Sequence, residues 1–195
     1  MTDFFALLDQ PRRPWLDPEK LKEVFHAKTL RAHPDASARG ENAIEAESVF
    51  AQINEAHQVL RDPKRRLQHL LSLEGRPPAA GGGTVPQEIA DAFQAVAAST
   101  QAADVTLQKV AAATSPLGRS LVAVELSQAR TRIDEALGTL LALRREADTE
   151  LRDLSDAAAD ADDRFSRLEN LYFRYAYLTR WIGQLEEKRT QLATW

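Results

Sequence analysis

The sequence predicts an all-α protein, with short helices in its N-terminal half and three long helices after them. Aliphatic residues and alanine dominate the 195 residues and β-branched residues are sparse, a mixture that favours helix over sheet. Apolar residues recur at helical spacing along most of the chain, and no strand pattern competes with them. Prolines fall between these apolar patterns, where helices begin or end.

The N-terminal half is expected to contain four helices whose limits are set by prolines. A short apolar turn over residues 4–8 stops before Pro11, because the residue before proline is pushed out of the helical region. Asp17-Pro18 is typical of an N-cap followed by proline at the first helical position, which predicts a helix that runs to Ala32. A longer helix from about residue 42 to 61 and a last one over 64–73 follow.

The C-terminal half shows three long helical patterns, over residues 87–112, 116–154 and 160–193. In each, apolar residues recur every seven positions with a companion row between them, as in a heptad seam. Three seams of similar length joined by short loops predict an antiparallel three-helix bundle. The seam expected on the first of these helices consists of Ile89, Phe93, Val96, Thr100, Ala103, Leu107 and Val110.

A stretch rich in proline and glycine, RPPAAGGGTVP at residues 76–86, separates the two halves. Paired prolines and three consecutive glycines cannot sustain a helix or a packed strand. The sequence therefore predicts an N-terminal domain over residues 1–76, a linker over 77–86 and a helical bundle over 87–195.

Composition excludes several classes of function. The chain has no cysteine, so it can form no disulfide and can hold neither zinc nor an iron–sulfur cluster through thiolates. A net charge of −4 does not fit a nucleic-acid binder, and no apolar run is long enough for a membrane span. His57 and His69 lack an acidic cluster at metal spacing, so we interpret them as surface or boundary residues. We expect a cytoplasmic protein with no cofactor and no metal.

The tripeptide His33-Pro34-Asp35 is the motif that carries the functional prediction. It follows an amphipathic helix with several basic residues and precedes a second amphipathic helix, an arrangement that resembles the J-domain. The likeness to HscB-type J-domain co-chaperones is closer still. Segments in the HscB order include Phe4-Phe5-Ala6-Leu7-Leu8, Ile53-Asn54-Glu55-Ala56, Val59-Leu60-Arg61-Asp62-Pro63, Leu70-Leu71-Ser72-Leu73-Glu74-Gly75 and, near the C-terminus, Gln184-Leu185-Glu186-Glu187-Lys188.

The resemblance implies a partner, the nucleotide-binding domain of a DnaK-class or HscA-type chaperone, whose ATPase the chain would stimulate. Proline makes the tripeptide turn rigid, and Asp35 can pair with an arginine of that partner. Four positions depart from the family: His26 and Ala27 stand at usually basic positions, Lys28 replaces a core leucine and Ala32 replaces a tyrosine. We expect Leu30, or a small rotation of the helix, to compensate. The chaperone-binding residues implied are Lys22, His26, Lys28, Arg31, His33, Pro34 and Asp35.

The resemblance also implies that the bundle binds a client, the iron–sulfur cluster scaffold protein. The middle of the chain offers no residue-by-residue match for the family's client-binding patch. Phe173, Tyr177 and Trp181 are spaced by four on the last helix, and they form either edge core packing or a client surface. An alternative function is an oligomerising scaffold that uses the J-domain for targeting, because heptad seams can pair between chains. The chain has no nucleophile–base set or phosphate loop, so we do not expect an enzyme.

Overall fold

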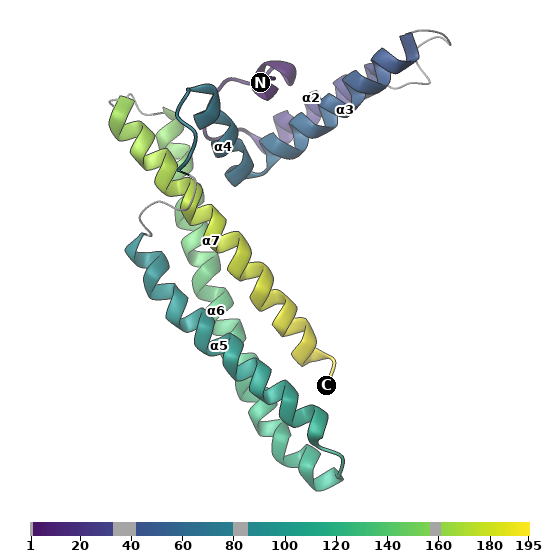
Figure 1. Cartoon of the computed structure of the whole chain (residues 1–195), viewed down its shortest axis with the longest axis vertical. Coiled ribbons are helices and arrows are strands. Elements are labelled where there is room, and N and C mark those ends of the chain that lie inside the picture. Colours follow the sequence, from purple (N-terminus) through teal and green to yellow (C-terminus); the bar gives the residue numbers. More distant parts are fainter. Residues whose placement is uncertain (1, 33–41, 80–85, 157–160) are drawn as a thin grey trace. The chain divides into compact units, whose positions relative to one another are not determined.

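The computed structural model describes residues 2–32, 42–79, 86–156 and 161–195, and it confirms the all-α fold class. The described residues form helices and no strand. The helices, shown in Figure 1, are α1 (Phe4–Leu7), α2 (Pro18–Arg31), α3 (Asn42–Arg61), α4 (Pro63–Leu73), α5 (Gln87–Ala112), α6 (Pro116–Asp156) and α7 (Ala161–Ala193).

Aspartate-proline pairs start two of the helices, as their sequence indicates. The side chain of Asp17 accepts hydrogen bonds from the backbone N–H groups of Glu19 and Lys20 at the start of α2. Asp62 accepts from the backbone N–H of Arg65, 2.8 Å away, so α4 begins at Pro63, one residue earlier than expected. Each such cap stabilises its helix by about 1 kcal/mol, because it satisfies backbone donors that have no partner within the helix.

The chain forms two compact units, and the helices α6 and α7 contribute to both. The N-terminal unit comprises residues 1–83 together with 150–172, and the bundle unit comprises 84–149 together with 173–195. The end of α6 and the start of α7 therefore belong with the short N-terminal helices. The sequence predicts a domain boundary at the stretch rich in proline and glycine, residues 76–86. That division of the chain into domains stays a prediction.

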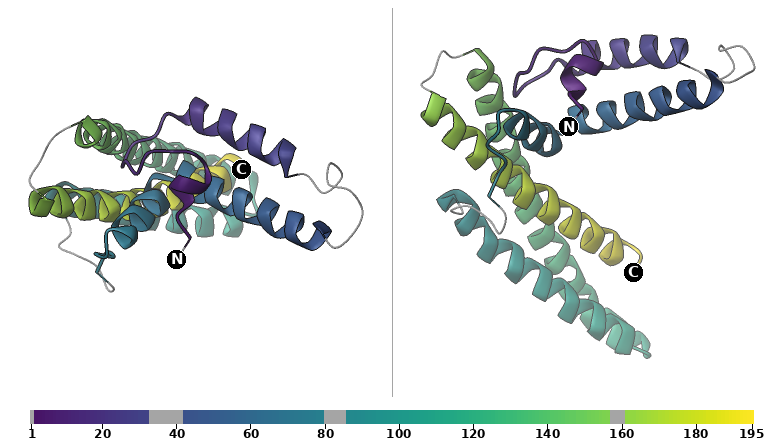
Figure 2. Two further views of the ribbon diagram at one scale, coloured as in Figure 1. Left: turned by 90° about the horizontal axis from the view of Figure 1, so that it is seen from above. Right: turned by 45° about the horizontal axis from the view of Figure 1, so that its top comes forward.

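In the N-terminal unit, α3 is the central helix and packs against α1, α2 and α4. Figure 2 shows α2 and α3 side by side and antiparallel, as a hairpin. Leu30 is 76% exposed, so it does not fill the space of the family's core leucine, and the expectation that it compensates is wrong. Among the residues of this unit that the structure describes, the buried apolar ones include Phe5, Leu8, Leu16, Leu21, Ile53, Ala56, Val59, Leu60, Leu67, Leu70, Leu71, Leu151, Leu154, Leu168 and Leu171.

Polar contacts join distant parts of the sequence within the N-terminal unit. The backbone N–H of Trp15 donates to the hydroxyl of Ser155 at 2.9 Å. Arg164 forms an ion pair with Glu74 at 2.9 Å, and the guanidinium of Arg76 lies 4.0 Å from the centre of the Phe165 ring. These contacts link the short helices to the end of α6 and the start of α7.

The bundle unit contains the expected antiparallel arrangement of α5, α6 and α7 (Figure 1). Its core includes the predicted leucine positions of α6 and α7, such as Leu140, Leu178 and Leu185. None of the described helices is both long enough and apolar enough to cross a membrane.

The companion row of buried residues on α5 is shifted by one position toward the N-terminus from the predicted row. Phe93 is 54% exposed, whereas Ala92 beside it is buried. The same shift recurs along the helix, where Ser99 and Thr106 are buried. Small side chains at these positions fit the narrow space between packed helices, and the Ser99 hydroxyl donates to the backbone carbonyl of Arg132 at 3.4 Å. The bulky aromatic ring is consequently left at the surface.

Candidate functional site

The tripeptide His33-Pro34-Asp35 lies outside the described residues. Helix α2 ends at Arg31 and α3 begins at Asn42, so the tripeptide belongs to the segment that connects the two antiparallel helices. What the structure describes of the candidate chaperone-binding surface is therefore α2 and its contacts.

The predicted basic residues of α2 lie on different sides of the helix. Lys22 and His26 are four residues apart, share one side and are exposed. Arg31 is also exposed, but nine residues from Lys22 it points to the opposite side at 100° per residue. Lys28 lies on the packed side, and its Nζ forms an ion pair with Asp9 at 2.8 Å. The structure thus brings Lys22 and His26 together and directs Lys28 toward the segment after α1.

The contact between α2 and α3 includes two aromatic rings in parallel stacking. The rings of Phe25 and His57 have centroids 3.9 Å apart and an interplanar angle of 12°. Burial lowers the pKa of His57, and the nearby charges of Arg61 and His26 lower it further. A neutral imidazole therefore packs against Phe25, which fits the interpretation of His57 as a boundary residue.

His69 is buried, so the interpretation of this residue as a surface or boundary side chain is wrong. Its Nε2 accepts a hydrogen bond from the backbone N–H of Phe4 at 3.1 Å, and its ring stacks on Phe4 and Phe5. Burial lowers the pKa of His69, Asp3 partly opposes this effect and Arg12 adds to it. The neutral ring holds α1 against α4, a role that helical periodicity alone does not reveal.

The aromatic residues of α7 lie mostly inside the bundle unit. Phe173 and Trp181 are each 7% exposed, and Tyr177 is half-buried. The rings of Tyr177 and Trp181 have centroids 5.4 Å apart, and Phe93 of α5 approaches Trp181 at 5.9 Å. Sequence reasoning missed Phe93 as a surface residue because it assigned this ring to the seam.

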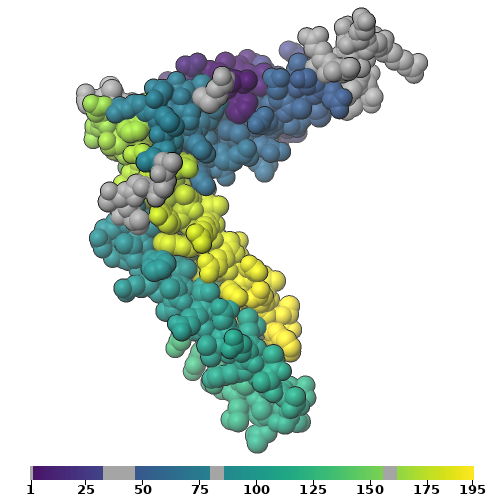
Figure 3. All heavy atoms as spheres, in the orientation of Figure 1, coloured from purple at the N-terminus to yellow at the C-terminus, as the bar shows by residue number. Residues whose placement is uncertain are grey.

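An open groove of about 590 Å³ runs between α5 and α7 beside these rings. Figure 3 shows the two helices meeting on this face, α5 in teal and α7 in yellow. Phe93, Tyr177 and Trp181 supply its aromatic wall, and Asp104 and Arg180 supply charges of opposite sign. The groove can accept an apolar side chain next to polar groups, and it provides no catalytic set.

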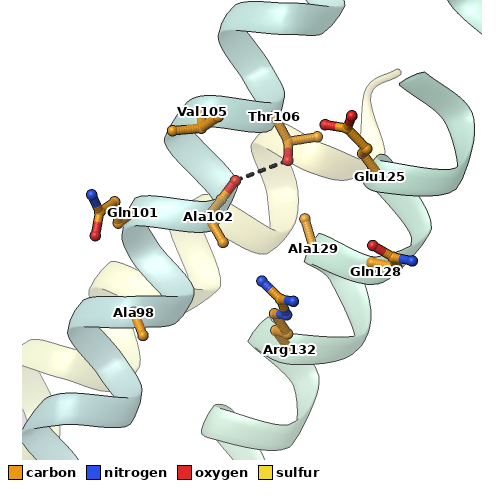
Figure 4. A pocket seen from close by; sticks show the side chains of 9 residues that line it. All are labelled: Ala98, Gln101, Ala102, Val105, Thr106, Glu125, Gln128, Ala129 and Arg132. Atoms are coloured by element: carbon orange, nitrogen blue, oxygen red, sulfur yellow. Dashed lines mark hydrogen bonds between the residues drawn. The ribbon is translucent and has the colours of Figure 1, made fainter. Parts of the chain in front are cut away.

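A second depression, of about 550 Å³, lies between α5 and α6 (Figure 4). The small side chains of Ala98, Ala102 and Ala129 leave this depression unfilled. The hydroxyl of Thr106 donates a hydrogen bond to the backbone carbonyl of Ala102 at 2.8 Å. Its carboxylate, Glu125, is paired with Lys109 at 2.6 Å. Amide groups and the Arg132 guanidinium complete the lining, so this depression holds no free acid–base pair.

Comparisons with known proteins agree with the resemblance in the N-terminal segment. The family model of the DnaJ domain matches residues 3–69. The chain is 35% identical to human DnaJ homolog subfamily B member 3 over 105 residues, which is 54% of this chain and 68% of that protein. It is 41% identical to the co-chaperone protein HscB homolog of Vibrio cholerae over 75 residues, 37% of this chain. The matched segment spans 44% of the length of that HscB relative.

Solved structures show the same fold over almost the whole chain. Chaperone HscB from Vibrio cholerae matches with a TM-score of 0.60 and 23% identity, covering 98% of this chain and 99% of that one. The human co-chaperone protein HscB matches with a TM-score of 0.65 and 19% identity, covering 97% and 83%. With a DnaJ domain at its N-terminus and a relative matched over two thirds of its length, the chain belongs to the J-domain family, and its fold is that of the HscB structures.

Proposed function

We propose that the chain stimulates ATP hydrolysis by a DnaK-class chaperone of the HscA type in the cytoplasm, and delivers a client held by the bundle unit. The observation that carries the proposal is the antiparallel pair α2 and α3, whose connecting segment contains His33-Pro34-Asp35, in a chain of the HscB type. Hydrolysis takes place on the chaperone, and this chain contributes binding energy.

Docking is directed by the charges of α2 and by the tripeptide. Exposed Lys22 and Arg31 attract an acidic surface over long range, and this raises the rate of encounter. The ring of a proline fixes its own φ angle, so Pro34 lowers the entropic cost when the neighbouring Asp35 pairs with a partner arginine. Lys28 joins this surface only when the partner displaces Asp9 from it. Binding the hydrolysis-competent state more tightly than the other state is what stimulates the ATPase.

The test is a steady-state ATPase assay of the cognate chaperone with the full-length chain. His33→Gln should abolish the stimulation and leave the helical circular dichroism spectrum unchanged, because the substitution leaves the sequences of α2 and α3 intact. Arg119→Gln, an exposed substitution in the bundle unit, should stimulate like the unaltered chain. Equal stimulation by both variants, or none by the unaltered chain, contradicts the proposal.

The groove between α5 and α7 is the surface we propose for the client, the iron–sulfur cluster scaffold protein. Phe93 is exposed beside Trp181 and Tyr177, and aromatic side chains in such clusters supply much of the binding energy of protein interfaces. Phe173 is buried and does not line the groove, so it is not part of the proposed client surface. Asp104 and Arg180 at the edge of the groove add polar specificity.

Capture of the scaffold protein by the immobilised full-length chain tests the client. Phe93→Ser should weaken retention about tenfold or more, because it removes an exposed ring without opening a cavity in the core. Leu141→Ser is the matched control, since Leu141 is an exposed apolar residue of the same unit outside the groove. If the chain stimulates the chaperone but does not retain the scaffold protein, the client is wrong and the co-chaperone function remains.

A second candidate, an oligomerising scaffold, is favoured by one observation. Leu117, Leu121 and Val124 follow one another at spacings of four and three on α6, and they are 72%, 68% and 62% exposed. Such a stripe can pair with the same stripe of a second chain. A dimer in light scattering that Leu121→Ser dissociates would support this candidate, and a monomer would argue against it.

A further inference from the structure

A pocket of about 480 Å³ lies in the N-terminal unit, and none of the residues proposed above for chaperone or client binding lines it. Its walls come from the segment before α2, from the first turn of α2 and from the end of α6. The residues that determine its chemistry are Arg13, Trp15, Asp17, Lys20, Arg152 and Ser155.

The lining of this pocket is positively charged, in a chain whose net charge is −4. Arg13, Lys20 and Arg152 line the pocket together with one carboxylate, Asp17. Among the described residues, none of these three cations forms an ion pair. Elsewhere in the same unit, cations do pair with carboxylates: Arg12 with Asp3, Lys28 with Asp9, Arg76 with Asp162 and Arg164 with Glu74.

The carboxylate of Asp17 is already engaged by the backbone. Its Oδ1 accepts from the N–H groups of Glu19 at 3.0 Å and Lys20 at 3.3 Å, as the N-cap of α2. This position keeps its charge at the helix start, where it does not form an ion pair with the three cations. An anion that enters the pocket meets arginine and lysine side chains that have no competing carboxylate partner in the described chain.

The wall on the α6 side is held in place. The guanidinium of Arg152 lies 5.6 Å from the centre of the Trp15 ring, a cation–π contact that limits the motion of a long side chain. The backbone N–H of Trp15 donates to Ser155, one turn further along α6. An arginine held against a ring by such a contact keeps N–H groups available for an oxyanion, and less entropy is lost when it binds.

We propose that this pocket binds a small, multiply charged phosphate compound, such as a diphosphate or the phosphate chain of a nucleotide. Two arginines and a lysine match the charge and the oxygen geometry of phosphate groups. The volume lies in the range of small-molecule sites, and a concave pocket of this size suits a compact ligand better than an extended acidic peptide.

Isothermal titration calorimetry of the full-length chain with sodium pyrophosphate tests the proposal. The chain should bind pyrophosphate, and more weakly as salt is added, because the three cations are exposed. Arg152→Gln should weaken binding about tenfold, since it removes charge-assisted hydrogen bonds. Arg145→Gln, an exposed arginine two turns earlier on α6, is the matched control and should leave the affinity unchanged.

Further arms of the titration identify the source of the phosphate. Adenosine should not bind, and ADP that binds more tightly than pyrophosphate would identify a nucleotide as the occupant. The proposal is overturned if pyrophosphate gives no heat of binding, if Arg152→Gln and Arg145→Gln behave alike, or if a polyglutamate peptide binds while pyrophosphate does not. Matching circular dichroism melting curves of both variants exclude unfolding as the cause of a loss.

Discussion

Replacing Arg66 with methionine should lower the free energy of unfolding of the N-terminal unit by about 3 kcal/mol or more. Arg66 is only 5% exposed, and its guanidinium joins parts of the chain that would otherwise separate. Its Nε donates to the carbonyl of Pro14 at 2.7 Å, and Nη1 donates to the carbonyl of Leu60. Methionine retains the apolar stem and loses both donors, so two buried carbonyl groups lose a charged partner.

Urea unfolding of the full-length chain, followed by circular dichroism and by tryptophan fluorescence, measures this loss. Arg65→Met is the control, because Arg65 is exposed on the same helix and its side chain makes no hydrogen bond or ion pair with the described residues. The first variant should unfold at a clearly lower urea concentration, and the control should change by less than about 0.5 kcal/mol. Two curves that coincide would mean that the buried arginine does not hold the segment before α2 in place.

Replacing Leu140 with alanine should destabilise the bundle unit by about 2–5 kcal/mol. Leu140 is 1% exposed and belongs to the core formed by α5, α6 and α7. Truncation removes three carbons from this core, so apolar burial is lost and a cavity is left among side chains that cannot fully collapse into it. The neighbouring leucine, Leu141, provides the control, because its side chain is 43% exposed and points away from the core.

Thermal unfolding measures the loss of stability in Leu140→Ala and in Leu141→Ala. Both variants lose the same atoms, so a difference between them reports the burial of the two side chains. Leu141→Ala should cost less than about 1 kcal/mol, since its side chain already contacts water in the folded state. A comparable loss in both variants would indicate that the outward face of α6 is covered, for example by a second chain. Such a result would favour self-association of the bundle.

Sequence reasoning predicts the helices well because their limits depend on local chemistry. Asp17-Pro18 and Asp62-Pro63 act as caps whatever the rest of the chain does, and α5 begins and ends at the predicted residues. The leucines at every seventh position of α7, including Leu171, Leu178 and Leu185, are all buried. These features depend only on residue spacing and on capping residues, and both can be read from the sequence.

Features that depend on partners from distant segments could not be predicted in this way. Ala92 and Phe93 fit a seam on α5 equally well by spacing, and only the closeness of α6 selects the smaller one. From the sequence alone Lys28 is a solvated cation on a helix surface, and only the structure shows its ion pair with Asp9. The buried His69 depends on a backbone N–H of α1, 65 residues away, and no pattern in α4 encodes that partner.

The packing of the N-terminal unit is completed by residues 150–172, which the ribosome adds late. Trp15 bonds Ser155, and the backbone N–H of Ala79 donates to Glu169, so sequence separations of 140 and 90 residues must be bridged. During synthesis the emerging short helices can form early, but their final packing must wait until α7 has begun to emerge. Until then the nascent chain exposes leucines that are buried in the folded unit, such as Leu67, Leu70 and Leu71.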